Sequence, residues 1–419
     1  MELKTDPVTN KTQVVVKGFS KLPITTMTGG CDFSTGTVNT DVLFYALPCT
    51  PLQPSDIATS GRKIPFLKDK PGAILGLRYQ SKSRGLAHKK SSSAFQHSVT
   101  IDMCSNDKSV NMKLAKNSIH ICGAKTPQGA TEAFQLLIQN LLRVQKNFNY
   151  ARSNPREAEI IAAFIAHHTI GLPIICSVQL GNSGKIQLVE RKTDNTVILP
   201  ADPQKLWHDQ YIKFRTDYLK KPRLVVYDSG TTDAEPATGS AAGSPSDPAF
   251  DFYTYLLSFA HEYKHHTSYR KMMQWVYFNI PKHYADNPDE VMCCDMKLEI
   301  TPLRVFMVNY NFRFEFDVNR EKLAEIFNNY DHFNADFDKA VKHQVTVTLP
   351  LDQKELTLVK RKKGKKEPQR SWLVQKCGSI TMSSPILDGT REAYYKFMKR
   401  IADKLPLIIV EKLPNAIKK

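Results

Sequence analysis

Two segments far apart in the chain share one pattern, in which a short strand is followed by a long amphipathic helix. The first reads SIHICGAK and then GATEAFQLLIQNLL, and the second reads SITMSSP and then GTREAYYKFMKRIA. Ser118 matches Ser379, and Gly129 matches Gly389 at the start of a shared Gly-x-x-Glu-Ala-aromatic sequence. Any strand–turn–helix unit has matching apolar periods, but the shared helix start favours an internal duplication.

Strand and helix patterns surround both segments. In the N-terminal part, alternation and turn-forming residues predict helices at 39–47 and 129–145 and strands at 13–18, 22–33, 73–80, 94–103, 109–116 and 118–125. In the C-terminal part they predict helices at 319–330 and 389–405 and strands at 303–318, 344–351, 355–362, 370–376 and 379–384. The sequence therefore predicts an α+β protein rich in antiparallel strands.

The stretch between the two segments has a different composition. Apolar periodicity predicts helices at 154–170, 202–219 and 251–277, whereas the small, polar, proline-containing stretch 228–249 predicts a disordered linker or a long exposed loop. We therefore expect three regions, namely an N-terminal repeat at 1–145, a mixed, mainly helical insertion at 146–300 and a C-terminal repeat at 301–419. Such insertions usually recruit partners or elaborate the fold.

The charge balance points to a polyanionic partner. Lys and Arg number 58 against 41 Asp and Glu, which gives a formal net charge of +17. Nucleic acid is the commonest polyanion inside cells, although a basic surface can also be merely solvated. The chain has no apolar run of about 18 residues and begins with a polar stretch, so we expect no membrane span and no signal peptide. Eight cysteines without CxxC spacing favour reduced thiols in an intracellular protein over a zinc site.

The duplicated arrangement resembles the TATA-binding protein family. Three segments carry the likeness: Gly123-Ala124-Lys125 before the first long helix, 309–317 as a first strand, and 28–33 at the same place in the N-terminal copy. The likeness covers about residues 25–145 and 303–406 and is closest to divergent members found in large nucleocytoplasmic DNA viruses. It implies two pseudo-symmetric repeats that form one curved antiparallel sheet with helices on its convex face. In that family the concave face binds the DNA minor groove and apolar wedges bend the duplex.

Carrying the family's DNA-binding positions over to this chain changes some residue types. Asn311 fits the family's central asparagine, and strand alternation turns Ile119 toward the helices. One of the family's wedge phenylalanine positions falls on Leu114 in the first copy and near Gln375 in the second. Phe95 is a further candidate for a wedge. The family's set of wedge residues is therefore largely lost. The resemblance implies concave-face DNA contacts from Thr26, Thr28, Leu114, His120, Cys122, Asn309, Asn311, Thr381 and Ser383.

Two basic clusters lie in predicted hairpin loops. The first consists of Lys82, Arg84, Lys89 and Lys90. The second is the run of Lys360, Arg361, Lys362, Lys363, Lys365 and Lys366. Both suit contacts with phosphate groups, which weaken as the salt concentration rises. The alternatives are a solvated hairpin tip and, for the second cluster, a nuclear-import signal.

One segment matches the HExxH pattern of zinc proteases. His261 and His265 would lie on one helix face as metal ligands, with Glu262 as the general base. Lys264 places a cation beside the would-be metal and no third ligand follows, so we expect no metal site. The histidine pair 167–168 ends an apolar helix and is expected to cap it or to lie in an interface.

No sequence motif calls for catalysis or a cofactor. We expect a non-enzymatic protein that binds double-stranded DNA, acts in viral transcription or in the host nucleus, and has weakened wedges. Two alternatives remain open: a protein-interaction or virion structural module that kept the fold without DNA recognition, and a metalloenzyme built on His261 and His265. Protein partners are expected at the convex face and at the middle insertion. The expected location is intracellular, in the nucleus or a viral factory, with packaging in the virion as a further option.

Overall fold

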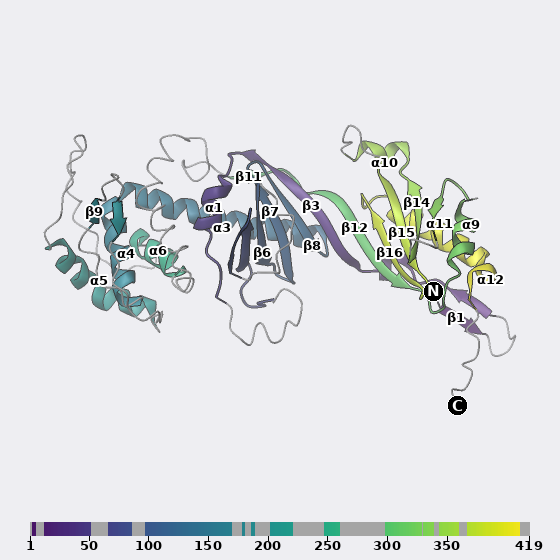
Figure 1. Ribbon diagram of the computed structural model, residues 1–419, viewed down its shortest axis with the longest axis horizontal. Helices are drawn as coiled ribbons and strands as arrows, with labels where there is room; N and C mark the ends of the chain where they lie inside the picture. The colour runs from purple at the N-terminus through teal and green to yellow at the C-terminus, as the bar shows by residue number, and fades with distance from the viewer. Residues whose placement is uncertain are drawn as a thin grey trace, which may run out of the picture.

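The computed structural model describes residues 2–5, 12–51, 66–85, 97–169, 178–180, 186–188, 202–220, 247–259, 298–328, 330–338, 343–359 and 367–410. These residues form an α+β protein, which confirms the class expected from the sequence. An open antiparallel sheet of 12 strands carries helices, and a helical segment extends from one end of the molecule (Figure 1).

Most strands expected in the N-terminal part are present, with shifted ends. The long strand β3 (Ile24–Thr35) leads into helix α1 (Thr40–Ala46), where the Asn39 side chain accepts a hydrogen bond from the Val42 amide. The hairpin partner of the next strand, β5 (Lys82–Gly85), occupies a stretch that the sequence predicted as a loop. The remaining elements are β4 (Ile74–Tyr79), β6 (Ser98–Cys104), β7 (Ser109–Ala115), β8 (Ser118–Ala124) and α3 (Pro127–Ser153).

The C-terminal part has a similar succession of elements. They are β12 (Arg304–Arg313), α9 (Arg320–Asn328), β13 (Asn334–Asp336), β14 (Gln344–Pro350), β15 (Gln369–Gln375), β16 (Ser379–Ser384), α11 (Thr390–Asp403) and the short α12 (Leu405–Ile408). The predicted strand at 355–362 is wrong over its described part, because Gln353–Thr357 form helix α10, whereas 360–362 lie outside the described residues. Asp352 and Glu355 build a reciprocal capping box that starts this helix.

The strand order of the large sheet is symmetrical about its central antiparallel pair, β3 and β12. Outward from β3 lie β8, β7, β6 and β4, and outward from β12 lie β16, β15, β14 and β13; β5, at the edge beyond β4, has no counterpart. Figure 1 shows β3 and β12 as long curved strands that run between the two halves. The short strand β11 (Glu299–Ile300) also pairs with β3, while β1 (Glu2–Thr5) with β2 (Thr12–Val15) and β9 (Val178–Leu180) with β10 (Ile186–Leu188) form separate pairs.

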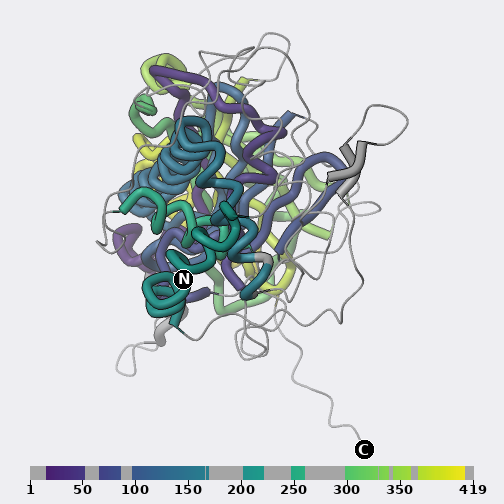
Figure 2. Tube along the Cα trace, turned by 90° about the vertical axis from the view of Figure 1, so that its left-hand side faces the viewer, coloured from purple at the N-terminus to yellow at the C-terminus, as the bar shows by residue number. Residues whose placement is uncertain are grey.

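Alternate side chains of the strands pack beneath the helices. In the C-terminal half, Trp372 of β15 stacks on Phe397 of α11, with ring centroids 4.9 Å apart, and Phe397 stacks on Phe327 of α9. In the N-terminal half, Ile119 of β8 and Phe134 of α3 belong to the same buried cluster. Burial of these rings and alkyl groups is the main force that holds the helices to the sheet. Figure 2, seen from one end of the molecule, shows helices gathered along one side of the strands.

Helix α3 joins the sheet to the helical segment. Its first half packs on β8, and its second half packs on α4 (Pro155–Thr169) and α6 (Pro248–Leu257). Phe164 of α4 meets the rings of Trp207 on α5 (Pro203–Leu219) and Tyr253 on α6. The rest of the predicted helix at 251–277 and most of the linker at 228–249 lie outside the described residues. No helix in the described part is long and apolar enough to cross a membrane.

The segment before β3 packs against the C-terminal half of the molecule. The ring of Phe19 lies 5.0 Å from that of Tyr310 and 5.4 Å from that of Tyr394. The Tyr394 hydroxyl donates to the Lys17 carbonyl oxygen at 2.8 Å, and the Phe19 amide donates to the Tyr395 hydroxyl at 3.1 Å. These N-terminal residues therefore contact α11 and β12, across the middle of the sheet from the rest of the N-terminal half.

Candidate nucleic-acid interface

The sheet face that points away from the buried cluster is lined mostly by small polar side chains, and we call it the free face. Strand register defines it, because paired residues point to the same side of a sheet. Thr28 pairs with Cys122, whose neighbours Ile121 and Ile119 are buried in the core, so both side chains lie on the free face. The expected DNA-contacting residues that lie on it are Thr26, Thr28, His120, Cys122, Asn309, Asn311, Thr381 and Ser383.

In its C-terminal half the free face is a ladder of hydroxyl and amide groups. One row crosses five neighbouring strands through Asn309, Ser383, Ser371, Thr348 and Asn334. The next row passes through Asn311, Thr381, Leu373, Thr346 and Asp336. Within these two rows the ionisable side chain is Asp336, at the sheet edge. This half therefore offers neutral hydrogen-bonding groups over a broad surface.

The N-terminal half of the free face carries charged groups instead. Arg78 of β4 forms an ion pair with Asp102 of β6 at 3.4 Å, and the Asn111 amide donates to the other carboxylate oxygen at 2.7 Å. Asp102 is fully buried, so these partners replace the water that its charge would otherwise need. Lys113 and His120 pair with each other in the neighbouring row. In the rows compared, the N-terminal half of the free face thus carries charged groups where the C-terminal half carries mostly neutral ones.

The middle of the free face is shaped by irregular pairing in β12. The register between β12 and β3 shifts between Val305 and Met307, which leaves Phe306 as the extra residue of a β-bulge. The Phe306 ring lies over Gly30 and meets the His120 ring nearly edge-on, with centroids 5.3 Å apart. Phe306 was not among the residues that the sequence predicted for this face. The signal was present in the run VFMV, which interrupts the alternation expected of a half-buried strand.

Leu114 does not belong to the free face. Its side chain is fully buried beneath the helices, together with Val110 and Met112 of the same strand. Side chains alternate along the strand, and Asn111 points to the free face. Leu114, three residues later, must therefore point into the core. The expectation that Leu114 contacts DNA is therefore corrected by its burial.

Of the two basic clusters, the structure describes only Lys82 and Arg84, both in β5. Lys82 is exposed and donates a hydrogen bond to the Tyr45 hydroxyl at 3.0 Å. Arg84 is buried, donates to the Phe44 carbonyl oxygen, and lies against the rings of Phe44 and Phe259. A phosphate contact from Arg84 is therefore excluded, since the guanidinium fastens α1 to the sheet. The remaining predicted contacts, Lys89, Lys90, Lys360, Arg361, Lys362, Lys363, Lys365 and Lys366, lie outside the described residues.

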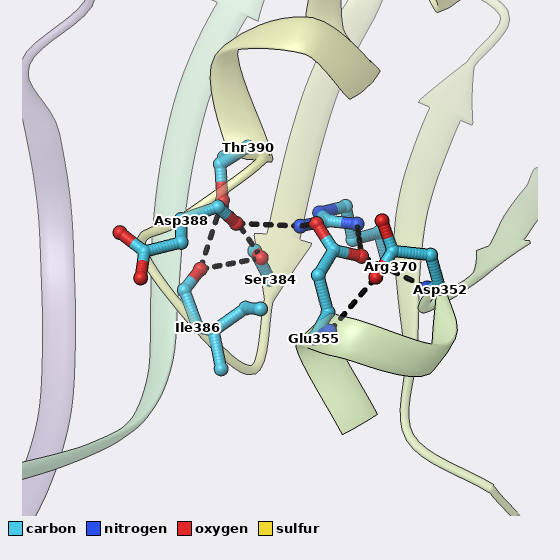
Figure 3. A network of polar contacts seen from close by, with 7 residues as sticks. All are labelled: Asp352, Glu355, Arg370, Ser384, Ile386, Asp388 and Thr390. Atoms are coloured by element: carbon cyan, nitrogen blue, oxygen red, sulfur yellow. Dashed lines mark hydrogen bonds and ion pairs between the residues drawn. The ribbon is translucent and has the colours of Figure 1, made fainter. Parts of the chain in front are cut away.

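A polar network joins α10 to the start of α11 (Figure 3). The buried Arg370 guanidinium holds both carboxylate oxygens of Glu355 and donates to the Asp388 carbonyl oxygen at 2.6 Å. Beside it, the Thr390 hydroxyl donates to the Ser384 hydroxyl at 2.9 Å. The Arg370 hydrogen bond lowers the pKa of the Glu355 carboxyl below its ordinary value of 4.5. Because the Arg370 and Glu355 charges are paired with each other, this network ties α10 to the start of α11 and gives no reason to read the pair as a ligand site.

The histidines singled out by the sequence fall into two situations. The HExxH segment, with His261, Glu262 and His265, lies outside the described residues. The pair 167–168 ends α4, and both rings contact Phe214 of α5, as in an interface between helices. Burial lowers the pKa of His168. Within the described ranges, no three His, Cys, Asp or Glu side chains are grouped as metal ligands would be.

The described cysteines are free thiols on both sides of the sheet. Cys31, Cys49 and Cys104 are buried, and burial raises the pKa of the Cys31 thiol to about 12. Cys122 and Cys377 are exposed, and the Cys122 sulfur accepts a hydrogen bond from the Thr28 hydroxyl at 3.7 Å. Thus Cys122 is one of the polar groups of the free face.

No protein-family model, no curated protein and no solved structure matches the chain. What bears on function is therefore the strand order of the sheet and the chemistry of its free face.

Proposed function

We propose that the chain is a non-enzymatic protein that binds double-stranded DNA on the free face of its sheet, as a two-repeat relative of TATA-binding proteins. The observation that carries this proposal is the strand order, in which the four strands outward from β3 (β8, β7, β6, β4) correspond to the four outward from β12 (β16, β15, β14, β13), with β5 as an additional edge strand. Along the chain, each half also has a long strand, a short helix, further strands and a long helix in the same succession. A duplicated unit accounts for this order and for the matched segments in the sequence.

Residue pairs on the free face support the duplication. Alignment of the two strand–helix segments matches Cys122 with Ser383. Cys122 pairs with Thr28 of the central strand β3, and Ser383 pairs with Asn309 of the central strand β12. Residues matched by sequence thus occupy matched positions in register, which periodicity alone does not require.

The chemistry of the free face suits a DNA groove better than a binding pocket. The minor groove of A·T pairs presents hydrogen-bond acceptors, and the amide and hydroxyl groups of the ladder through Asn309 and Ser383 include donors for them. The net charge of +17 supplies the general attraction to phosphate groups. The proposal extends to a role in viral transcription, in the nucleus or a viral factory.

The test is a titration of end-labelled duplexes with the full-length chain at several salt concentrations. We expect the logarithm of the affinity to fall linearly with the logarithm of salt concentration, by about 0.9 per phosphate contact. We also expect tighter binding to A·T-rich than to G·C-rich duplexes. No binding at low salt by the folded chain would rule the proposal out.

A matched pair of variants locates the binding surface. Asn311→Asp puts a carboxylate on the free face, and Gln210→Glu makes the same chemical change on the exposed side of α5. We expect weaker DNA binding from Asn311→Asp only, because a like charge there opposes the phosphates. Equal effects of the two substitutions would place DNA somewhere other than the free face.

A protein-interaction or virion structural module is the second candidate. It is favoured by Asp32 and Asp102, whose carboxylates neutralise Arg304 and Arg78 on the N-terminal half of the free face. Paired arginines attract phosphate less than free ones do, whereas protein interfaces commonly contain such pairs. The same titration separates the candidates, since this one predicts no salt-dependent affinity for duplex DNA.

A further inference from the structure

The N-terminal half of the free face carries a row of side chains, several of them basic, that crosses six neighbouring strands from β4 to β12. Paired residues point to the same side of a sheet, so the members of the row lie side by side. The row runs through Arg78, Thr100, Lys113, His120, Gly30 and Arg304. We call it the basic row. It attracts a chain of phosphate groups more than the neutral rows of the C-terminal half do.

The two arginines at the ends of the basic row are held in place by ion pairs. Arg78 contacts Asp102 at 3.4 Å and Arg304 contacts Asp32 at 2.7 Å, each through Nη2. The two arginine side chains are 30% and 37% exposed. A guanidinium has several N–H donors, so one contact with a carboxylate leaves others for a phosphate oxygen. The ion pairs reduce the local charge, but they also reduce the entropy lost when the arginines bind.

The aromatic ring of Phe306 covers the position of Gly30 in the basic row. A Cβ atom at Gly30 would lie 2.9 Å from Cε2 of that ring, so the glycine backbone forms the floor beneath it. Phe306 reaches this place as the extra residue of the β-bulge, and it is 39% exposed. The His120 ring contacts it from the next strand, with 63° between the ring planes. An exposed ring on a sheet, with cations on both sides of it, is suited to stacking against an unpaired base.

We infer that the N-terminal half of the free face binds single-stranded DNA, with an unpaired base stacked on Phe306 and the adjoining phosphates on the basic row. A duplex hides the faces of its bases in its own stack, so an exposed ring of this kind suits a single strand. The choice of DNA over RNA rests on the proposed function, since a strand that leaves a duplex on the C-terminal half would meet this row. The stacking itself does not depend on duplex binding.

The test is a titration of a labelled oligothymidine strand with the full-length chain, followed by fluorescence anisotropy at several salt concentrations. We expect the logarithm of the affinity to fall with the logarithm of salt concentration by about 0.7 per phosphate contact. Phe306→Leu keeps an apolar side chain but removes the ring, so it should weaken single-strand binding by about fivefold to a hundredfold. Phe306→Tyr keeps the ring and should retain the affinity. A strand that carries iodouracil should cross-link to Phe306 on irradiation.

The matched control is Phe66→Leu, which makes the same change at a phenylalanine of similar exposure, 38%, that is not part of the basic row. This control should leave the affinity for the single strand unchanged. If the wild type binds no single strand at low salt, or if Phe306→Leu binds as tightly as Phe306→Tyr, the inference is overturned while duplex binding stands or falls on its own titration. Single-strand binding without duplex binding would support the stacking and refute the proposed function. An oligouridine strand that binds more tightly than oligothymidine would overturn the choice of DNA.

Discussion

Arg370 at the start of β15 holds Glu355 of α10 through both of its terminal nitrogens, with Nη1–Oε2 at 2.9 Å and Nη2–Oε1 at 2.7 Å. The arginine side chain is 3% exposed and the glutamate side chain 13%. Water therefore has little access to either charged group, and each group depends on the other as its partner. The pair therefore fastens helix α10 to the first residues of β15.

Loss of the arginine should destabilise the protein strongly. Arg370→Met leaves the largely buried Glu355 carboxylate without its cation. We expect the free energy of unfolding to fall by about 3 kcal/mol. Urea denaturation followed by circular dichroism measures the change. The double variant Arg370→Met/Glu355→Gln should recover part of the loss, because it removes the unpaired charge. If it is no more stable than the single variant, the ion pair is not the cause.

The same pair predicts a pH dependence of stability. The pKa of Glu355 is lowered below its ordinary value of 4.5 by the Arg370 hydrogen bond, so the folded state favours the charged form. The stabilisation is therefore complete well above pH 4.5 and is lost as the pH falls through the folded-state pKa. Measured against Glu355→Gln, the stability advantage of the wild type should shrink below that pH. A constant difference between pH 7 and pH 3 would contradict this.

The two glycines matched by sequence should respond in opposite directions to alanine. Gly389 has a φ of 66°, and a Cβ atom there would lie 1.8 Å from Oε1 of Glu355. Gly389→Ala should therefore destabilise the protein by at least about 1 kcal/mol. Gly129 lies within the first turn of α3, and a Cβ atom there would lie 3.1 Å from Oγ1 of Thr126, an exposed side chain that can shift slightly. Alanine there should therefore favour the helix, by less than about 1 kcal/mol. Thermal denaturation of both variants checks this, and a Gly389→Ala variant as stable as the wild type would contradict the argument from its positive φ and the close Glu355 contact.

The stability of the protein should depend on the size of the Trp372 side chain and much less on its indole nitrogen. It is fully buried and stacked on Phe397, so Trp372→Ala should cost about 3–5 kcal/mol of stability. Its Nε1 has no hydrogen-bond partner among the described residues, so Trp372→Phe should cost much less. Leu373→Ala, one residue further on the free face, is the control. Chemical denaturation that ranks the tryptophan variants equally would disprove the packing argument.

Periodicity in the sequence was enough to predict most strands and long helices. The alternation in 109–116 and 118–125 determines which side chains can be buried, and β7 and β8 follow it closely. The stretch 355–362 misled because its apolar residues also alternate. There the capping box of Asp352 and Glu355 favours a helix, and local hydrogen bonding outweighs the pattern.

The candidate site was predictable where it depends on alternation and not where it depends on distant contacts. Alternation correctly separates His120 from Ile119. Leu114 was placed on the DNA-binding face by the family likeness, against the alternation of side chains along 109–116, and it is buried. Arg84 was grouped with solvated lysines because its partner Phe259 is far away in the sequence. The bulge that exposes Phe306 depends on how β12 pairs with β3, which local sequence does not reveal.

By itself the sequence determined the α+β class, the matched strand–helix segments and the positive charge, because these follow from residue type and short-range periodicity. Only the tertiary structure decided the order of the strands, the pairing of β3 with β12, the burial of Arg84 and the exposure of Phe306. The reason is physical. Which strands become neighbours depends on how the apolar faces of the strands pack against the helices. The free energy of this packing comes from contacts between residues hundreds of positions apart.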